Sequence, residues 1–368
     1  MSTNIWINFP GKRKLTEAVR EIKTWNVDLQ STRTFRYAVG VTTATAISFS
    51  FNWPLHFITP LFASIYLSLP MPAPTIRKVI NMFIHLLIAF SLGIVFTLFL
   101  MPYPLVFIPA IGLVMFNIYY FANRGGSVFF ALMTLISAVI LPMMGTLHHV
   151  LSHEIVFYFV FSYMLALIIY ITAHVLIPDP LSESSVNDHG RFEPGYSRDA
   201  ALSAWKSTIA VLPIFVLFVT MGWSDHFVMI TYSCVLILTP QLSKGTVVGL
   251  KLLKSNLIGG VSFMIFYGLI VAVPSYLFSI ALILLTTLIF GKSIFSDHHY
   301  SKYLTCAMSA FFILVGGSLG EGANFADKLI TRVLLIGGAM IYVVGVMSIL
   351  DCYLPTGFSQ SMEKKPSG

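Results

Sequence analysis

The sequence predicts an all-α, polytopic membrane protein of about twelve transmembrane helices, arranged as two parallel six-helix repeats. Three observations lead to this prediction. Of the 368 residues, 57% are hydrophobic and only 10% are charged, whereas soluble domains carry roughly 25% charged residues. Many apolar runs approach about 20 residues, the length of helix that crosses about 30 Å of hydrocarbon. A distinctive residue pattern also occurs twice along the chain.

The apolar runs are expected to be helices because lipid cannot satisfy the hydrogen bonds of an open backbone. The runs expected to span the bilayer are 35–52, 55–70, 79–100, 103–121, 127–147, 154–177, 204–221, 226–240, 252–272, 275–291, 303–320 and 328–350. The runs 55–70 and 226–240 are the shortest, so their ends are the hardest to place.

Polarity divides the chain into five segments. These are a cytoplasmic amphipathic segment (1–33), a first membrane repeat (34–178), a cytoplasmic linker (179–202), a second membrane repeat (203–352) and a cytoplasmic tail (353–368). Within the first segment, Leu15, Val19 and Ile22 share one helical face and Lys and Arg lie on the other. This pattern favours a helix on the inner leaflet, although a solvated helix would show it too.

The net charge of +7 is interpreted as orientation in the membrane and not as binding of nucleic acid. With the N-terminus in the cytoplasm, Lys328 and Arg332 are the only two of the 22 Lys and Arg residues that fall outside. This asymmetry is typical of a multi-pass protein of the bacterial inner membrane with both termini in the cytoplasm.

A shift of 170 residues places the first half on the second. The motif Trp-x-x-His-Phe recurs in this register, as Trp53, His56 and Phe57 and again as Trp223, His226 and Phe227. Arg36 falls on Lys206, and Asp179 has a twin in Asp351 at an offset of 172. Because each half has an even number of predicted crossings, both halves enter from the same side and are parallel repeats.

The stretch RTFRYAVGVTTATAISFSFNWPLHFITPLFASIYLSLPMPAPTIRKVIN resembles the opening of the fusaric acid resistance and aromatic acid exporter superfamily. The second half repeats this opening as SAWKSTIAV, GWSDHF, LTPQLSKG and KLLKSNLIGG, and ADKLITRVLLIGGAMI is similar to the final helix of that family, with Arg332 before Gly337. The chain departs from the family in lacking the Arg-x-x-Gly-Thr opening of the third helix and a large cytoplasmic domain between the halves, so it looks like a compact branch. The resemblance implies export of small organic anions, aromatic carboxylates among them, often with a periplasmic adaptor of the membrane-fusion type.

Several ionisable residues are candidates for a substrate path or for proton coupling. His56 and His226 open the second helix of each half, where a histidine pair could relay protons, with Trp53, Trp223, Phe57 and Phe227 as gate or interface aromatics. A duplicated anchoring corner at the headgroups explains the same residues. Arg36 and Lys206 could draw an organic anion inward, although snorkelling to lipid phosphates is the commoner role of such residues.

Two further groups lie deeper or outside. His85 lies two turns into the third predicted helix with Asn81 on the same face, and an ionisable residue at this depth is a candidate for function. A neutral histidine bonded between helices is the alternative. Lys328 and Arg332 are expected on one outer helical face, where they either pair with Glu321 and Asp327 or bind a substrate carboxylate.

The most favoured function is that of a secondary transporter that exports small organic anions. A membrane scaffold of an envelope complex and a membrane enzyme acting on a lipid-linked substrate are the alternatives. No GxxxxGK[ST] motif occurs, and we expect no enzyme activity, no cofactor and no metal. The expected partners are the lipid bilayer and a small organic anion, with an adaptor protein implied by the resemblance and a homo-oligomer left open.

Overall fold

The computed structural model describes residues 29–69, 73–147, 149–179, 195–222, 245–296 and 301–318, with further positions between 230 and 238 and between 334 and 350. Its elements are α2 (Leu29–Phe51), α3 (Ile58–Ser68), α4 (Ile76–Val95), the π-helical turn η1 (Phe96–Leu100), α5 (Pro104–Asn123), α6 (Val128–Leu147), α7 (His149–Leu176), α8 (Arg198–Thr220), α10 (Gly245–Ala272), α11 (Tyr276–Ile294) and α12 (Ser301–Ser318). No strand occurs among these residues, so the all-α prediction is confirmed.

Seven helices of the described chain are long and apolar enough to cross a membrane, which makes the protein a multi-pass membrane protein. α3 has 11 residues, which at about 1.5 Å per residue is roughly half of the hydrocarbon thickness. α2 is long but less apolar, and its hydroxyl groups bond to its own backbone: Thr45 and Ser48 donate to the carbonyls of Val41 and Ala44 at 2.8 and 2.7 Å. Such a helix is stable in a membrane where other helices cover it, and α2 packs against α3, α7 and α11.

Three helices begin at least six residues before their apolar runs. α2 begins at Leu29, α8 at Arg198 and α10 at Gly245, whereas the runs were predicted to start at 35, 204 and 252. At the start of α8, the Ser197 hydroxyl accepts a hydrogen bond from the Ala200 N–H at 3.4 Å, a typical N-cap. An apolar run marks only the lipid-facing part of a helix, and the polar first turns can continue the same helix into water or headgroups.

The helix directions in the first half agree with a chain that crosses the membrane back and forth. Ala89 meets Ser137 across α4 and α6, and Gly93 meets Leu141 one turn further along both helices, so α4 and α6 run parallel. In contrast, α2 begins beside the end of α7, so these two helices are antiparallel. A parallel third and fifth helix and an antiparallel first and sixth helix are what a six-crossing half requires.

Helices of one half pack on helices of the other. α2 packs along α11, where the hydroxyls of Thr42 and Thr287 lie 3.4 Å apart. α8 packs in the same way along α5, where the rings of Trp205 and Phe116 are 6.1 Å apart. Because α11 coincides with the fourth predicted span of the second half, the first helix of each half lies on the fourth helix of the other.

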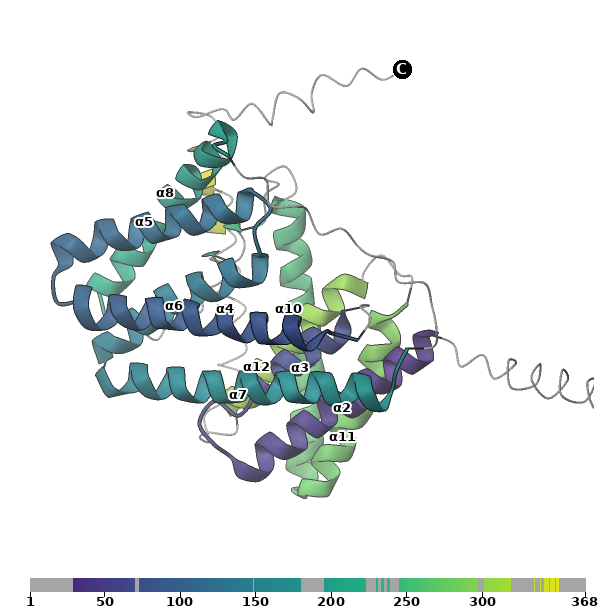
Figure 1. Ribbon diagram of the computed structural model, residues 1–368. Coiled ribbons are helices and arrows are strands. Elements are labelled where there is room, and N and C mark those ends of the chain that lie inside the picture. Colours follow the sequence, from purple (N-terminus) through teal and green to yellow (C-terminus); the bar gives the residue numbers. More distant parts are fainter. Residues whose placement is uncertain are drawn as a thin grey trace, which may run out of the picture.

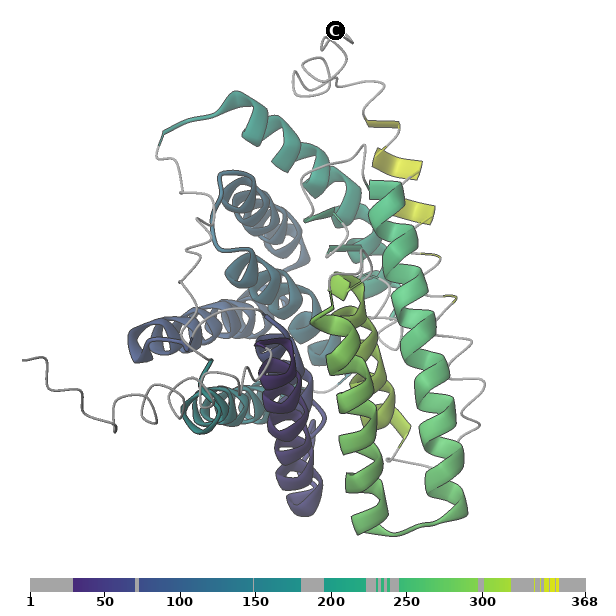
Figure 2. The same cartoon turned by 90° about the vertical axis from the view of Figure 1, so that its right-hand side faces the viewer.

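The described helices run in two main directions, one shared by α4, α6 and α7 and the other followed by α10. α4, α6 and α7 run side by side across Figure 1, while α10 runs up the view. After the turn shown in Figure 2, α7 is seen nearly end-on, whereas α2 and α10 keep their length. Segments from both halves therefore interleave, which agrees with the exchanged contacts of their first helices.

Burial along α2 and α8 supports the offset of 170. Arg36 and Lys206 are 1% and 2% exposed, whereas their neighbours Phe35 and Trp205 are 56% and 52% exposed. The interface of the third and fifth helices has the same register in both halves, because Ala89 meets Ser137 and Gly259 meets Ala307. Both members of this pair are shifted by 170 residues.

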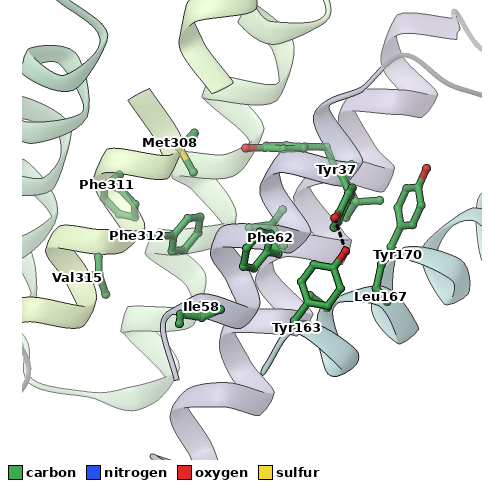
Figure 3. Packing of buried hydrophobic residues seen from close by; sticks show 14 of the residues in the cluster. Tyr37, Ile58, Phe62, Tyr163, Leu167, Tyr170, Met308, Phe311, Phe312 and Val315 are labelled. Carbon is green, nitrogen blue, oxygen red and sulfur yellow. Dashed lines mark hydrogen bonds between the residues drawn. The ribbon is translucent and has the colours of Figure 1, made fainter. Parts of the chain in front are cut away.

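The hydrophobic core is divided into two main clusters, and both contain residues of both halves. The first joins α2, α3 and α7 to α10, α11 and α12, with Tyr37, Phe62 and Tyr163 on one side and Phe311 and Phe312 on the other (Figure 3). The second joins α5 and α6 to α8 and to described positions between 230 and 238 and between 343 and 347. Each half therefore completes its apolar packing with residues of the other.

Candidate functional site: a buried arginine–aspartate cluster

The candidate site lies where the start of α2 meets the end of α7. Arg33 and Arg36 project from the first turns of α2, and Asp179 follows α7 by three residues. One turn further along α2, Gly40 permits this approach, because a methyl group there would lie 3.4 Å from the Ala173 Cβ and would overlap Leu67. The antiparallel packing of the two helices thus assembles residues that are about 140 positions apart in the sequence.

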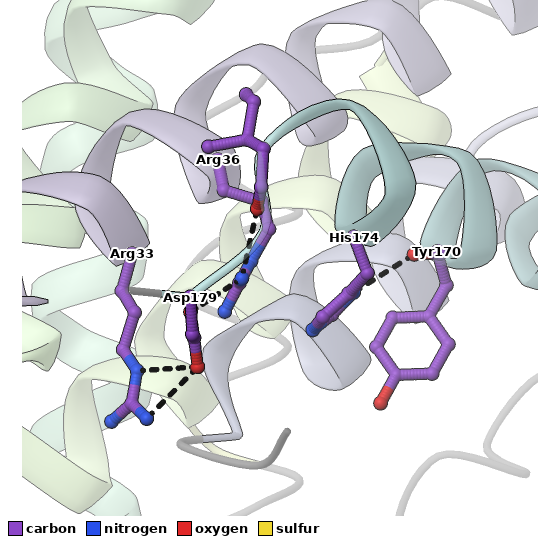
Figure 4. A network of polar contacts seen from close by, with 6 residues as sticks. Arg33, Arg36, Tyr170, His174 and Asp179 are labelled. Carbon is purple, nitrogen blue, oxygen red and sulfur yellow. Dashed lines mark hydrogen bonds and ion pairs between the residues drawn. The ribbon is translucent and has the colours of Figure 1, made fainter. Parts of the chain in front are cut away.

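Both arginines bind the same carboxylate, but with different edges of the guanidinium group. Arg33 donates from Nε and Nη2 to Asp179 Oδ2, at 3.3 and 3.0 Å. Arg36 donates from Nη1 to Asp179 Oδ1 at 2.6 Å and to the Ile177 carbonyl at 3.1 Å (Figure 4). The Arg33 and Asp179 side chains are partly exposed, whereas the Arg36 side chain is 1% exposed.

Two donors of Arg36 are left without a partner. Its Nε and Nη2 atoms are buried and make no hydrogen bond to any described residue. Buried polar groups are nearly always hydrogen-bonded, and each exception calls for an explanation. The exception is costly here because the group is a charged one.

Aromatic rings border the cluster on the α7 side. The Nδ1 atom of buried His174 lies 2.9 Å from the Tyr170 carbonyl oxygen, and the two rings stand edge to face at 4.7 Å (Figure 4). Tyr170 continues into further rings, with Tyr66 at 5.5 Å, and the Tyr66 hydroxyl lies 2.6 Å from that of Tyr163.

The cluster favours the charged form of its aspartate. Burial alone would raise the pKa of Asp179, but the hydrogen bonds and positive charges of Arg36 and Arg33 outweigh burial and lower this pKa below its ordinary value. Asp179 is therefore an anion at neutral pH, and the cluster of two arginines and one aspartate carries a net positive charge.

Lys206 occupies the matching place in the second half. It lies on α8 and is buried to the same degree as Arg36. Neither side chain reaches the surface of the protein. Both halves thus hold a buried cation about two turns into their first helix.

The Trp-x-x-His-Phe corner of the first half is a packed turn between α2 and α3. The Trp53 indole N–H donates to the Ser162 hydroxyl of α7 at 2.9 Å. His56 stacks edge-on against Phe49 at 4.6 Å, and its Nδ1 lies 3.0 Å from the Trp53 carbonyl oxygen. Leu55 has a φ of 61°, an unusual left-handed conformation for a residue with a branched side chain. These contacts tie the corner to α2 and α7 within the protein.

The corner also touches the other half, and its histidine is tuned toward the neutral form. The Phe57 ring lies directly on Gly316 of α12, where any Cβ would overlap it. Burial lowers the pKa of His56, an effect that its hydrogen bond with the Trp53 backbone opposes. The Nε2 atom of His56 is buried and has no hydrogen bond within the described chain.

The remaining described candidates lie apart from the cluster. His85 is half-buried on α4, with its ring 5.3 Å from that of Phe130 on α6, and Asn81 is exposed. The structure brings neither of them to Arg36. The other candidates lie outside the described residues: Trp223, His226, Phe227, Glu321, Asp327, Lys328 and Arg332.

Reasoning from the sequence missed the partners of Arg36. Asp179 was placed in the linker, and Arg33 and His174 were not singled out. A signal was present, however, because Arg36 and Asp179 stand at the entry and exit of one half, as Lys206 and Asp351 do in the other. The first and last helices of a six-crossing half have these ends on the same side of the membrane.

Comparison with known proteins gives a family match for part of the chain. Neither a curated protein nor a solved structure matches the chain. Residues 33–173 match the family described as "Protein of unknown function (DUF2955)". The match begins at Arg33 and ends near the end of α7, so the chain is similar to this family over the first six-helix half.

Proposed function

We propose that this chain is a secondary transporter that exports small organic anions across a bacterial inner membrane, with both termini in the cytoplasm. The observation that carries the proposal is the buried cation at the same position in the first helix of each half, Arg36 and Lys206. A charged side chain within a membrane protein is costly and typically marks a substrate or ion pathway.

The duplicated architecture supports transport. Parallel repeats in transporters place their substrate between the halves and expose it alternately to either side by rocking one half against the other. Here the halves meet along two equivalent contacts, α2 with α11 and α5 with α8. A pair of like contacts can act as a pivot for such a motion.

The charge of the described cluster supports an anion as the cargo. Arg33 and Arg36 share the single carboxylate of Asp179, which leaves one positive charge without a counter-charge in the described salt bridges. Small organic anions, aromatic carboxylates among them, are also what the resemblance to the aromatic acid exporters implies. The periplasmic membrane-fusion adaptor implied by the same resemblance is part of this proposal.

Reconstitution tests the proposal. Purified protein in liposomes should carry radiolabelled benzoate against its gradient when a pH difference or a membrane potential is applied, and should not do so when both are collapsed. In liposomes with Arg36→Gln protein, the initial rate of benzoate transport should be at least about tenfold lower, as expected when a buried charged contact is removed. The matched control is Arg124→Gln, because Arg124 is a half-buried arginine directly after α5 that bonds the Gly195 carbonyl and makes no contact with the cluster.

Two outcomes would contradict transport. Absence of flux for benzoate and for other organic anions, with and without a co-reconstituted adaptor, would favour the scaffold. Flux that is unchanged by Arg36→Gln would detach transport from the buried cation. Labelling of single cysteines introduced at 181–194 tests the orientation, and these cysteines should react only with reagent applied from the cytoplasmic side.

A further inference from the structure

We propose that the free Nε–Nη2 edge of Arg36 binds the carboxylate of a small aromatic or apolar monocarboxylate. This inference rests on the proposed function and names its binding group. The edge carries two parallel N–H donors, and both are buried without a hydrogen bond to any described residue. A planar guanidinium fork of this kind matches the two oxygens of a carboxylate.

The neighbouring arginine shows how this edge is used. Arg33 presents the same two atoms, Nε and Nη2, to Asp179 Oδ2 at 3.3 and 3.0 Å. Arg36 instead meets Asp179 with Nη1 alone, at 2.6 Å. A single carboxylate is thus shared by two forks, and only Arg33, the partly exposed arginine, has its side-on edge filled. The more deeply buried arginine lacks the second carboxylate that its geometry would accept.

Charge balance selects an anion over a neutral ligand. Two guanidinium groups face one carboxylate, and Arg36 is fully enclosed. An uncompensated charge in a low-dielectric interior is unfavourable, and a ligand carboxylate would supply the missing negative charge. A neutral amide of the same shape would offer one acceptor without the charge, so it should bind far more weakly.

The surroundings select the rest of the ligand. His174 and Tyr170 lie beside the cluster on α7 (Figure 4), and Tyr66 and Tyr163 extend this run of rings. Aromatic walls favour a ring or another apolar body next to the carboxylate. Because Arg36 is 1% exposed, this conformation is closed, and the ligand enters when the start of α2 and the end of α7 move apart.

Binding to the purified full-length protein tests this site. The probes are radiolabelled benzoate and cyclohexanecarboxylate, with benzamide as the uncharged competitor, measured by equilibrium dialysis in detergent. Wild-type protein should bind both carboxylates in a saturable manner, and benzamide should not compete. Arg36→Gln should weaken binding by at least about a hundredfold, and Arg36→Lys by at least about tenfold because an ammonium group lacks the planar fork. Arg124→Gln should stay within about twofold of wild type.

The outcomes separate the site from the transport proposal. If Arg36→Lys, verified as monodisperse by size exclusion, binds both carboxylates as wild type does, the fork is not the binding group, whatever the flux. If wild-type protein binds neither carboxylate while its liposomes still carry other anions, the ligand class is wrong and transport stands. If Arg36→Gln does not fold, the Arg36→Lys protein alone decides. Equal competition by benzamide would also overturn the site.

Discussion

At the contact between the third and fifth helices, the two halves use the same positions and different chemistry. In the first half, the Ser137 hydroxyl of α6 donates to the Ala89 carbonyl of α4 at 2.7 Å. In the second half, the equivalent residues are Gly259 and Ala307, and the glycine lies so close to the Ala307 carbonyl that no Cβ fits. At these positions one interface has a hydrogen bond between helices and the other a close backbone approach, the two common ways of joining helices in lipid. Duplication has therefore retained the register of the backbone while the side chains diverged.

The first helices of the two halves differ less, because both have a buried cation at the same position. Arg36 has a fork of donors and Lys206 a single ammonium group, although both are buried at the same position. A guanidinium can hold Asp179 and a second carboxylate at once, whereas an ammonium group acts as a point charge. This difference places the fork-like anion site in the first half.

The largest effect is expected from Asp179→Asn. Removal of the carboxylate leaves the enclosed Arg36 with no negative partner in the described chain, and breaking such a pair costs about 3 kcal/mol. The melting temperature of the purified protein should fall accordingly. The comparison variant is Asp351→Asn, since Asp351 is the sequence twin of Asp179 and lies outside the described residues. An equal loss in both variants would show that the halves share this pairing.

The matched control for these variants is Glu154→Gln, because Glu154 is exposed at the other end of α7. It should leave the melting temperature unchanged. If Asp179→Asn were as stable as Glu154→Gln, the ion pairs with Arg33 and Arg36 would not stabilise the fold, and the described cluster would lose its structural role.

Gly259→Ala gives the second half the side chain that the first half has at Ala89. The added Cβ would overlap the Ala307 carbonyl, and backbone that has to move apart in this way costs about 2 kcal/mol. The control is Gly268→Ala on the same helix, where a Cβ meets nothing within 4 Å. Thermal unfolding of both variants checks this. Equal melting temperatures would mean that α10 and α12 can separate as easily as α4 and α6.

Acidification should lower the stability of the folded protein in two steps, one caused by His56 and the other by Asp179. The pKa of His56 lies below its ordinary value of 6.5, so the fold prefers neutral His56 and loses stability as the pH falls below 6.5. The pKa of Asp179 lies below 3.8, so its ion pairs stabilise the fold above pH 3.8 and are lost as the pH falls through the lowered pKa.

Melting temperatures of wild type, His56→Gln and Asp179→Asn between pH 8 and pH 3 separate these steps. The stability of His56→Gln relative to wild type should rise between pH 7 and pH 5. The deficit of Asp179→Asn should stay constant down to pH 5 and shrink below pH 4. A deficit that is independent of pH throughout would remove the charge of Asp179 from the explanation.

The smallest effect is expected from Ser137→Ala, which gives the first half the alanine that the second half has at Ala307. It removes one hydrogen bond between helices and leaves the packing in place, which in membranes costs about 0.6 kcal/mol. Thr172→Ala is the control, because the Thr172 hydroxyl bonds within its own helix. A loss as large as that of Gly259→Ala would show that the first half depends on this hydroxyl as much as the second half depends on its glycine.

The long apolar helices of the described chain, their order and the offset of 170 were predictable, because lipid demands long apolar helices and duplication repeats them. Predictions at the level of helix ends were less accurate, since polar first turns such as the one capped by Ser197 continue the helix beyond the hydrocarbon. The π-helical turn at Phe96–Leu100 also had no signal in the apolar pattern.

The candidate site was predictable only in part. Arg36 and Lys206 stood out as cations in apolar surroundings, but their burial depends on which helix covers them. The partner Asp179 lies in a polar stretch where an acidic residue is ordinary, and its role follows from the contact of α2 with α7. Long-range pairing of this kind becomes visible only when the antiparallel order of the first and last helices is combined with the twin acids.

The two shared cores bear on how such a molecule could arise. Each core needs helices from both halves, so a lone six-helix unit would expose a wide apolar surface that lipid covers but does not hold in shape. A protein with a single six-helix unit would complete itself by pairing with a second copy, in which the first helix of each copy packs on the fourth helix of the other. Fusion of two such copies into one polypeptide would then allow arginine at one of the two equivalent positions, Arg36, and lysine at the other, Lys206. Identical subunits cannot differ in this way.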